Sequence, residues 1–587
     1  MLRGIGTSKG IGIGHALVLK NVECEVRQYE IKDTEAEIKR FKDGVDAFVR
    51  ETDELIEKLA AKLNGDDSNA LVLKNQEYLA KDIQLISQVE DIIKTGKVNA
   101  EAALYEACDG LKKLFLSMDN EAMAQRVSDI EDMRVRLTSI LLGVKNVDLT
   151  QLEDNTIIIA DEIHPSMTAN MDTEHIAGII SEKGGDTSHA SILARALEIP
   201  AVLSVKGICS SVKDGQEIIV DGAYGEVFVE PSAITTRIYE KKKRQYDESV
   251  VELKKYINKQ TMTKDGRRVM LAANIGNALE AAKAVKDGAE GVGLFRTEFL
   301  FMNGSKLPTE DEQFTEYKKA AVLLDGRELT IRTLDIGGDK DIPYMGLSKE
   351  TNPFLGYRAI RFCLDRVDVF TTQLRAILRA SAYGNIRIMI PMITSVTEIN
   401  AVKKIIAGIC KDLDKKDIKY DADIKVGIMV ETPAAAIMAD VLAKEVDFFS
   451  IGTNDLTQYT LAVDRGNENV SYLYSALNPA VIRSIKRIIE CAHNAGIEVG
   501  MCGEAAADER MIPLLLAFGL DEFSVTVSRV LEVRKEIASW SVKEAKDIAQ
   551  SISGYSEEKE VANYLNDYVM SAKERGNVAE QSQNIEK

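Results

Sequence analysis

The sequence predicts a multidomain α/β protein: an α/β domain carrying an inserted helical bundle, a linking helix, and a C-terminal (β/α)8 barrel of the TIM type. Three observations predict this arrangement. Short β-branched runs punctuated by glycine or proline flank a long helical stretch, a strongly charged helix follows, and eight short apolar runs then alternate with amphipathic helices. Eight alternating β and α segments favour a closed parallel barrel.

Composition and charge limit the classes of function. The chain has 587 residues, which suggests three or four folded units. Its 74 basic and 93 acidic side chains give a net charge of −19, so we expect no nucleic-acid partner, because phosphate backbones need basic surfaces. No stretch has the roughly 20 apolar residues of a membrane span, and no signal-peptide core is present. The seven cysteines form no CxxC pair, which argues against disulfides and zinc and favours the cytoplasm.

The N-terminal half reads as one domain interrupted by another. No proline occurs before Pro165, and residues 33–143 repeat apolar positions at spacings of three and four, which predicts a helical bundle. Strand-like runs in 1–32 and 144–231 are expected to form one α/β domain around that bundle. Residues 232–260 predict a charged linking helix, and we prefer this interpretation of its KKKR run to a nucleic-acid patch.

The barrel is expected over residues 261–570, followed by a polar tail over 571–587. In barrels of this type, reactive side chains lie where the strands end. The predicted strand ends carry mostly polar or charged residues: Asn274, Arg296, Arg332, Glu431, Asn454, Asp455 and Cys502. We therefore expect a reactive centre at this edge of the barrel.

His189 lies in the string SEKGGDTSHASILARAL, where two glycines allow a turn and Asp186, Thr187 and Ser188 are helix-capping residue types. At a helix N-terminus, the positive field keeps an imidazole neutral and nucleophilic, and the free amides favour an attached phosphate. The hydroxyl of Thr168 could orient the ring. The alternative is a structural cap with an incidental histidine.

Arginines near the strand ends indicate an anion site. Arg296, Arg332 and Arg465 are expected near one mouth of the barrel, and Arg358 could be a fourth. A guanidinium group matches phosphate and carboxylate oxygens with two parallel hydrogen bonds. Each arginine alone could be an ordinary surface residue, but several at one mouth favour a bound anion.

Two carboxylates accompany these arginines. Glu431 and Asp455 are expected to end adjacent strands, and two carboxylates beside a phosphate site are the usual protein contribution to a Mg²⁺ ion. The alternative is that they form structural ion pairs with the arginines. The amide of the neighbouring Asn454 could hold a phosphate oxygen.

Cys502 ends the seventh predicted strand between glycine-containing turns, in GMCGEAA. A free thiol has a pKa of roughly 8.5, so it is mostly protonated at neutral pH and can donate a proton. The alternative is a buried structural cysteine, the commoner role for this residue type.

Seven strings together resemble Enzyme I of the bacterial phosphoenolpyruvate:sugar phosphotransferase system: GGDTSHASILAR, GLFRTEFLFM, IRTLDIGGDK, NPFLGYRAIR, IMVETPAA, FFSIGTNDLTQY and GMCGEAA. The resemblance covers about residues 1–570, and no candidate position departs from it. It implies that the α/β domain is a swivelling phosphohistidine domain.

The resemblance also implies a reaction. Phosphoenolpyruvate and Mg²⁺ would bind in the barrel, and His189 would take the phosphoryl group on Nε2. The phosphate would pass to the histidine of a small phosphocarrier protein docked on the inserted bundle, as the first step of sugar uptake. Pyruvate would leave after Cys502 protonates its enolate, and the barrel would form a homodimer.

Two alternatives stay open at this point. Pyruvate phosphate dikinase and phosphoenolpyruvate synthase look alike over the histidine domain and barrel, but they carry an additional ATP-binding domain for which we expect no room here. The second alternative is a catalytically silent binding protein on the same scaffold. Its signature would be loss of the histidine, arginines or carboxylates, and none is lost.

Overall fold

The structure is a computed structural model that describes residues 1–19, 27–62, 67–116, 121–143, 149, 152–164, 166–167, 171–185, 188–302, 306–337, 342–347 and 350–568. The chain divides into two compact units, Met1–Val250 and Val251–Lys587, and each is described by itself. Within the described ranges, no helix is both long enough and apolar enough to cross a membrane. The predicted tail over 571–587 lies outside the described residues.

The first unit is built on one eight-stranded sheet with the order β1-β8-β7-β3-β4-β5-β6-β2. Strands β3, β4 and β5 run parallel, whereas β7 is antiparallel to β3. The strands span Leu2–Arg3 (β1), Ile5–Ser8 (β2), Ile11–Leu19 (β3), Thr156–Ala160 (β4), Ile176–Ser181 (β5), Ala201–Leu203 (β6), Glu217–Asp221 (β7) and Glu226–Val229 (β8).

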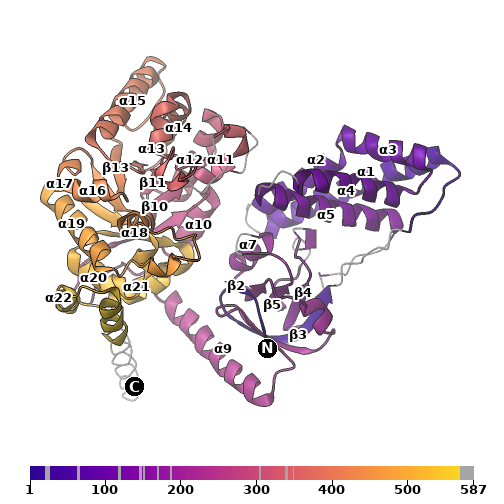
Figure 1. Cartoon of the computed structure of the whole chain (residues 1–587), viewed down its shortest axis with the longest axis horizontal. Helices are drawn as coiled ribbons and strands as arrows, with labels where there is room; N and C mark the ends of the chain where they lie inside the picture. The colour runs from indigo at the N-terminus through magenta and orange to yellow at the C-terminus, as the bar shows by residue number, and fades with distance from the viewer. Residues whose placement is uncertain are drawn as a thin grey trace. The chain divides into compact units, whose positions relative to one another are not determined.

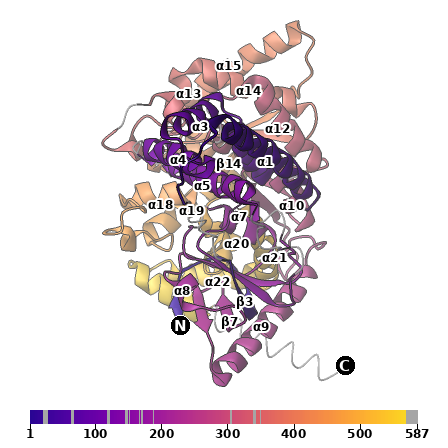
Figure 2. The ribbon, with the colours of Figure 1, turned by 90° about the vertical axis from the view of Figure 1, so that its right-hand side faces the viewer.

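A helical bundle is inserted between β3 and β4, as predicted, because these two strands are neighbours in the sheet but distant in sequence. Figure 1 and Figure 2 show its helices running alongside one another. Phe41, Phe48, Val89 and Leu104 are among the fully buried side chains that hold it together. The helices span Thr34–Lys62 (α1), Asp67–Ala80 (α2), Ile83–Gly96 (α3), Ala100–Leu116 (α4) and Glu121–Leu142 (α5).

Further helices described in this part of the chain are His189–Ala196 (α7), Ile208–Ser211 (α8) and Ala233–Lys254 (α9). The last is the predicted linking helix. Its one buried side chain is Tyr239, whose ring packs on Phe228 of β8 at 4.9 Å between centroids. The rest of α9 is mostly exposed or half-buried and charged, as expected for a solvated connector.

The second unit contains a closed barrel of eight parallel strands, in the order β9 to β16 around the ring. All eight strands predicted from the sequence are present. They span Met270–Ile275 (β9), Gly291–Arg296 (β10), Leu329–Arg332 (β11), Ile386–Ile390 (β12), Lys425–Val430 (β13), Phe448–Ile451 (β14), Glu498–Met501 (β15) and Glu522–Thr526 (β16).

Helices surround the strands in Figure 1, as in other barrels of this type. They span Ala278–Lys286 (α10), Glu298–Met302 (α11), Glu310–Leu323 (α12), Ile360–Asp365 (α13), Val367–Ser381 (α14), Val396–Lys415 (α15), Pro433–Ile437 (α16), Ala439–Leu442 (α17), Thr453–Leu461 (α18), Pro479–Ala495 (α19), Met511–Phe518 (α20), Val530–Ala538 (α21) and Val542–Ile552 (α22).

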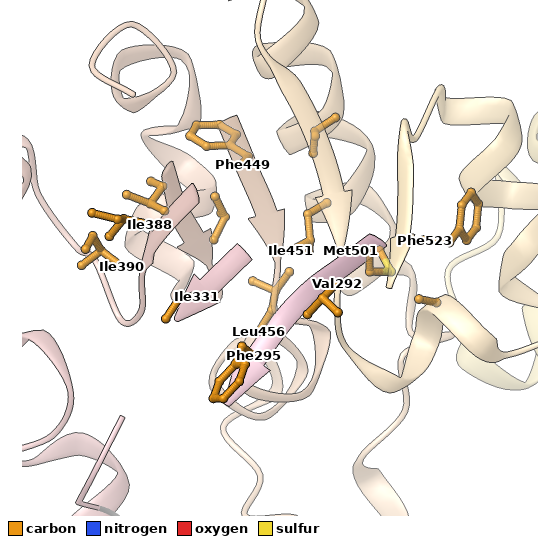
Figure 3. Close-up of a cluster of buried hydrophobic side chains, with 14 of the residues drawn as sticks. Val292, Phe295, Ile331, Ile388, Ile390, Phe449, Ile451, Leu456, Met501 and Phe523 are labelled. Atoms are coloured by element: carbon orange, nitrogen blue, oxygen red, sulfur yellow. The ribbon is translucent and has the colours of Figure 1, made fainter. Parts of the chain in front are cut away.

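Successive side chains along each barrel strand point alternately to the outside and to the inside of the barrel. One set of side chains belongs to the large core shared with the helices, and Figure 3 shows it on successive strands: Phe295, Ile331, Ile388, Ile390, Phe449, Met501 and Phe523. The residues between them form a separate small cluster: Leu294, Met389, Met429, Phe448 and Cys502. Because strand residues alternate between faces, this second set fills the barrel interior. Arg296, Arg332 and Glu431 follow outward-facing residues and so also point inward.

A polar layer closes the amino-terminal end of the barrel. Arg387 is 4% exposed and pairs with Glu328, with Glu522 at 3.0 Å and with Glu498 at 3.3 Å. One guanidinium therefore serves three carboxylates. Burial raises the pKa of Glu328 to about 7, and repulsion from Glu522 and Glu498 adds to this against the opposing pull of Arg387.

This layer predicts how stability depends on pH. A carboxyl group whose pKa is raised in the fold binds its proton more tightly than in the unfolded chain, so its contribution is present at low pH and is lost as pH rises through about 7. From pH 5 to pH 8 we expect the barrel to lose on the order of 1–3 kcal/mol of unfolding free energy through Glu328. Other buried carboxyl groups with raised pKa values, Glu522 and Glu431, add to the total, so Glu328→Gln should reduce the pH dependence by about this amount without abolishing it.

Denaturant unfolding can measure this effect through the fluorescence of Trp540, which is the one tryptophan of the chain and is buried in the barrel core. Glu490, an exposed carboxylate paired with Lys486, supplies the control. Glu490→Gln should keep the wild-type dependence on pH. An unchanged dependence in Glu328→Gln would contradict the assignment.

Candidate active site

The predicted strand-end residues occupy the carboxyl edge of the barrel. Arg296 and Arg332 are the last residues of β10 and β11. Glu431 and Cys502 directly follow β13 and β15. This placement brings residues from four different strands to one mouth.

Asn454 and Asp455 were predicted to end a strand, and this placement was wrong. Strand β14 ends at Ile451, and both residues lie in the first turn of α18, which begins at Thr453. Gly452 allows the change of direction because a Cβ there would lie 2.8 Å from the Glu431 carboxylate. The backbone therefore turns into a helix directly over Glu431.

A continuous network of buried ion pairs runs along this edge. Arg332 pairs with Glu298 at 2.6 Å and with Asp335 at 3.1 Å. Arg358 also pairs with Asp335, at 2.9 Å, and with Asp455 at 2.8 Å. For Asp455, the ion-pair alternative considered from the sequence is thus observed. Burial opposes the charged form of Arg332, but Glu298, Asp335 and Glu431 raise its pKa above the ordinary value, so it remains a cation.

Glu431 is a deeply buried carboxylate of the mouth, at 1% exposure. Its Oε1 accepts a 2.7 Å hydrogen bond from the backbone N–H of Met392, a non-glycine residue held at φ +58°. Burial, together with repulsion from Asp455 and Asp335, raises the pKa of Glu431 to about 8 against the pull of Arg332 and Arg358. Glu431 therefore holds a proton at neutral pH unless another cation approaches.

Counting charges shows what the mouth lacks. Glu298, Asp335, Glu431 and Asp455 are four carboxyl groups facing the two guanidinium groups of Arg332 and Arg358, so two negative charges are uncompensated when all four are ionised and one when Glu431 holds its proton. A divalent cation would balance this excess. In the described part of the chain, no group of three or more His, Cys, Asp or Glu side chains is arranged to hold a metal ion. Protein ligands would therefore be few, as is usual for Mg²⁺.

A cavity of about 900 Å³ opens beside this network. Its lining includes four of the residues predicted for this edge, Asn274, Arg296, Asn454 and Cys502, together with Arg510, Arg529 and Asn566. Arg296 makes no ion pair with the residues that the structure describes, so its donors remain available to an anion in the cavity. The volume exceeds what a small phosphorylated acid requires.

The thiol of Cys502 is buried at the floor of the mouth, at 4% exposure. Its Sγ lies 3.8 Å from the carbonyl oxygen of Ile451, and Asn274 donates a 3.0 Å hydrogen bond to its carbonyl oxygen. Burial raises the pKa of the thiol to about 11, and Ser450, Arg332 and Arg296 oppose the rise. The sulfur is held in place and keeps its proton.

The remaining mouth residues are arranged by polar contacts. The amide of Asn454 donates to Glu504 Oε1 at 2.9 Å, and the backbone N–H of Glu504 donates back to Asn454 Oδ1 at 3.0 Å. Arg465 is exposed just beyond α18, and its side chain bonds to Tyr474. The structure thus places Arg465 at the rim and Asn454 beside the cavity.

In the first unit, His189 is the first residue of α7. Ser188 is the N-cap, and its Oγ accepts a 3.4 Å hydrogen bond from the N–H of Ser191, as its residue type predicted. The turn before it needs Gly184, which has φ +101°. Thr168, predicted to orient the histidine, lies outside the described residues, as do residues 186–187.

Sequence reasoning missed two residues of the network, Glu298 and Asp335. Both stand inside strings noted for their arginines, GLFRTEFLFM and IRTLDIGGDK, two and three positions after an inward-facing arginine. That spacing was the available signal. The spacing alone could not identify Asp335 as a partner of two arginines, because the second of them, Arg358, lies 23 positions further along the chain.

Comparison with known proteins defines the class of this site. Three family models match the chain: "PEP-utilising enzyme, N-terminal" over residues 3–126, "PEP-utilising enzyme, mobile domain" over 152–225, and "PEP-utilising enzyme, PEP-binding domain" over 250–542. PEP is phosphoenolpyruvate. The barrel and its mouth lie within the third match, and together the three matches give the chain the domains of a PEP-utilising enzyme.

Curated relatives narrow the class of PEP-utilising enzyme to which the chain belongs. A phosphoenolpyruvate-protein phosphotransferase of Bacillus subtilis is 46% identical, covering 96% of this chain and 99% of its own length. One from Listeria innocua is 42% identical, covering 97% and 99%. A solved structure titled as an NMR solution structure of Enzyme I (nEIt) is 34% identical, covers 42% of this chain and 100% of its own, and has a TM-score of 0.36. The chain belongs to the phosphoenolpyruvate–protein phosphotransferase family, and the dikinase alternative is not favoured.

The environment of Cys502 predicts how slowly its thiol reacts. With a pKa of about 11, its thiolate fraction at pH 8 is about one in a thousand, and it should grow about tenfold per pH unit up to pH 10. Brief iodoacetamide pulses, quantified by mass spectrometry of the Cys502 peptide, should follow that slope. Circular dichroism at each pH controls for unfolding. A rate that levels off below pH 9 would show that the burial has been misjudged.

Proposed function

We propose that this chain transfers the phosphoryl group of phosphoenolpyruvate to its own His189 and then to the histidine of a small phosphocarrier protein, releasing pyruvate, as the first step of sugar uptake. The observation that carries this proposal is the buried network of guanidinium and carboxylate groups at the barrel mouth. Nearly full-length relatives with phosphoenolpyruvate-protein phosphotransferase in their names support it. In this proposal the barrel binds the donor and the first unit carries the phosphate.

The arginines of the mouth are proposed to bind phosphoenolpyruvate. Arg332 is buried, and its Nε has no hydrogen-bond partner among the described residues, so a donor is held ready in a low-dielectric setting. Arg296 faces the cavity, and Arg358, Arg465 and Asn454 complete the proposed set. Phosphoryl transfer depends mainly on positioning and on stabilising charge, which fixed guanidinium groups provide.

Glu431 and Asp455 are proposed to hold a Mg²⁺ ion. Their fit rests on the excess of carboxyl over guanidinium groups at the mouth, four against two, and on the raised pKa of Glu431, which shows that this position favours added positive charge. When bound, Mg²⁺ would neutralise charge on the phosphoryl and enolate oxygens. Asp455 already pairs with Arg358, so this guanidinium would share the carboxylate with the ion.

The proposed chemistry has two parts. The P–O bond of phosphoenolpyruvate breaks as a bond forms between phosphorus and Nε2 of His189, and the electron pair stays on the enolate. The thiol of Cys502 then gives its proton to the enolate carbon, and solvent returns the proton to the thiolate. A buried thiol that keeps its proton suits this donation. The Thr168 hydroxyl is proposed to orient the imidazole.

The proposed partners follow the same reasoning. The phosphocarrier would dock on the inserted bundle, where Tyr78 and Ile83 are exposed at 62% and 83%. The barrel would form a homodimer, and its exposed Leu355, Ile437 and Tyr472 are suitable apolar contacts. We place the enzyme in the cytoplasm, where its donor and a soluble carrier would meet it.

Labelled phosphoenolpyruvate tests the proposal on the full chain. With Mg²⁺, the wild type should take up acid-labile, base-stable label, and His189→Ala should take up none, because the histidine is the proposed acceptor. His15, an exposed histidine on β3, is the matched control, and His15→Ala should label normally. Wild-type stoichiometry of label in His189→Ala, on whatever residue, would sink the proposal.

A further inference from the structure

Asp335 occupies a special position in the ion-pair network because, of the acidic residues that the structure describes, it is the one that pairs with both buried guanidinium groups. Its Oδ1 accepts a 2.9 Å hydrogen bond from Nε of Arg358, and its Oδ2 accepts one of 3.1 Å from Nη2 of the same arginine. The same Oδ2 lies 3.1 Å from Nη1 of Arg332. Asp335 is itself 1% exposed.

The outer carboxylates of the network each hold one arginine. Glu298 contacts Arg332, at 2.6 Å, and Asp455 contacts Arg358, at 2.8 Å. Each guanidinium group therefore pairs with two carboxylates, one of its own and Asp335, which both arginines share. Without it, nothing in the network would fix the distance between the two cations, which repel one another.

The backbone supports the same contact. Asp335 lies just after β11, and Gly337, at φ +105°, lies so near Arg358 that a Cβ would come within 3.0 Å of the Arg358 Cα. Ala359 has φ +51° and ψ −122°, a conformation that a residue with a side chain rarely adopts, and its N–H donates to Ile336 O at 3.0 Å. The segments carrying Asp335 and Arg358 are thus pressed together at the cost of backbone strain.

We propose that Asp335 is a positioning residue for phosphoenolpyruvate: it holds Arg332 and Arg358 at a fixed separation and orientation before the substrate arrives. This inference rests on the proposed function of the barrel. Guanidinium groups that are already oriented need no reorganisation when charge develops on the transferring phosphoryl group, so their effect on the rate is larger. Asp335 itself need not touch the substrate.

Asp335→Asn in the full chain separates positioning from folding. Asparagine keeps the shape and one oxygen acceptor but removes the charge that grips both arginines. The remaining carboxylates, Glu298, Glu431 and Asp455, still balance Arg332 and Arg358, so the barrel should fold. We expect kcat/KM for phosphoenolpyruvate to fall about a hundredfold, with a rise in KM and a fall in kcat.

Two readouts exclude a merely structural role. Exchange of phosphate between His189 and the phosphocarrier needs no phosphoenolpyruvate, so it should stay within about twofold of the wild-type rate in Asp335→Asn. Asp335→Glu, which restores the charge with a longer reach, should recover about tenfold in kcat/KM. Asp368→Asn, which breaks an exposed ion pair with Arg366 in the same unit, should leave both rates unchanged.

A double-mutant cycle tests whether Asp335 acts through the arginines. Adding Asp335→Asn to Arg332→Ala should cost much less than it costs the wild type, because the group it positions is already gone. Full additivity, a kcat/KM of Asp335→Asn within about threefold of wild type, or an equal loss of carrier exchange would each overturn the inference. If Arg332→Ala also left phosphoenolpyruvate use intact, the proposed function would fail as well.

Discussion

Buried carboxylates outnumber buried guanidinium groups at the carboxyl edge of the barrel, and the architecture of the mouth follows from accommodating them. Isolated charges are very costly to bury, so each buried guanidinium group here is held by two carboxylates. Arg332 and Arg358 alternate with Glu298, Asp335 and Asp455 along a chain of short contacts. Burial raises the pKa of Glu431, and repulsion from the neighbouring Asp455 and Asp335 raises it further.

The local backbone is shaped by this requirement. Gly452 and Gly503 have no room for a side chain, since a Cβ would collide with Glu431 or with Thr453. Met392 and Ala359, two non-glycine residues beside the network, are held at positive φ, which strains the backbone there. A site whose charged groups are fixed before a ligand binds needs closely packed backbone, and the strained residues and closely packed glycines lie at this one edge. At the opposite end of the barrel the described residues show a different arrangement, in which one guanidinium, Arg387, pairs with three carboxylates behind an apolar layer.

Periodicity in the sequence was sufficient to find the eight barrel strands and the insertion of a bundle into a sheet, because strand and helix periods are local properties. It also placed Arg296, Arg332, Glu431 and Cys502 at the mouth, since barrel geometry brings strand ends together. It failed where the chain turns sharply, as at Gly452, which moves Asp455 into a helix. It could not reveal Asp335 as a shared partner, because Arg358 reaches it from across a long loop.

Cation binding with simultaneous detection of protons tests the account most directly. Titrating the full chain with Mn²⁺ in the absence of phosphoenolpyruvate should show one site per chain, displaced by Mg²⁺. At pH 7, where Glu431 holds its proton, binding should release about one proton, and at pH 9 it should release almost none. Glu431→Gln should bind much more weakly and release no proton. Equal affinity in that variant, or the same proton release at pH 7 and pH 9, would contradict the claim that the excess of carboxylates at the mouth is a cation site.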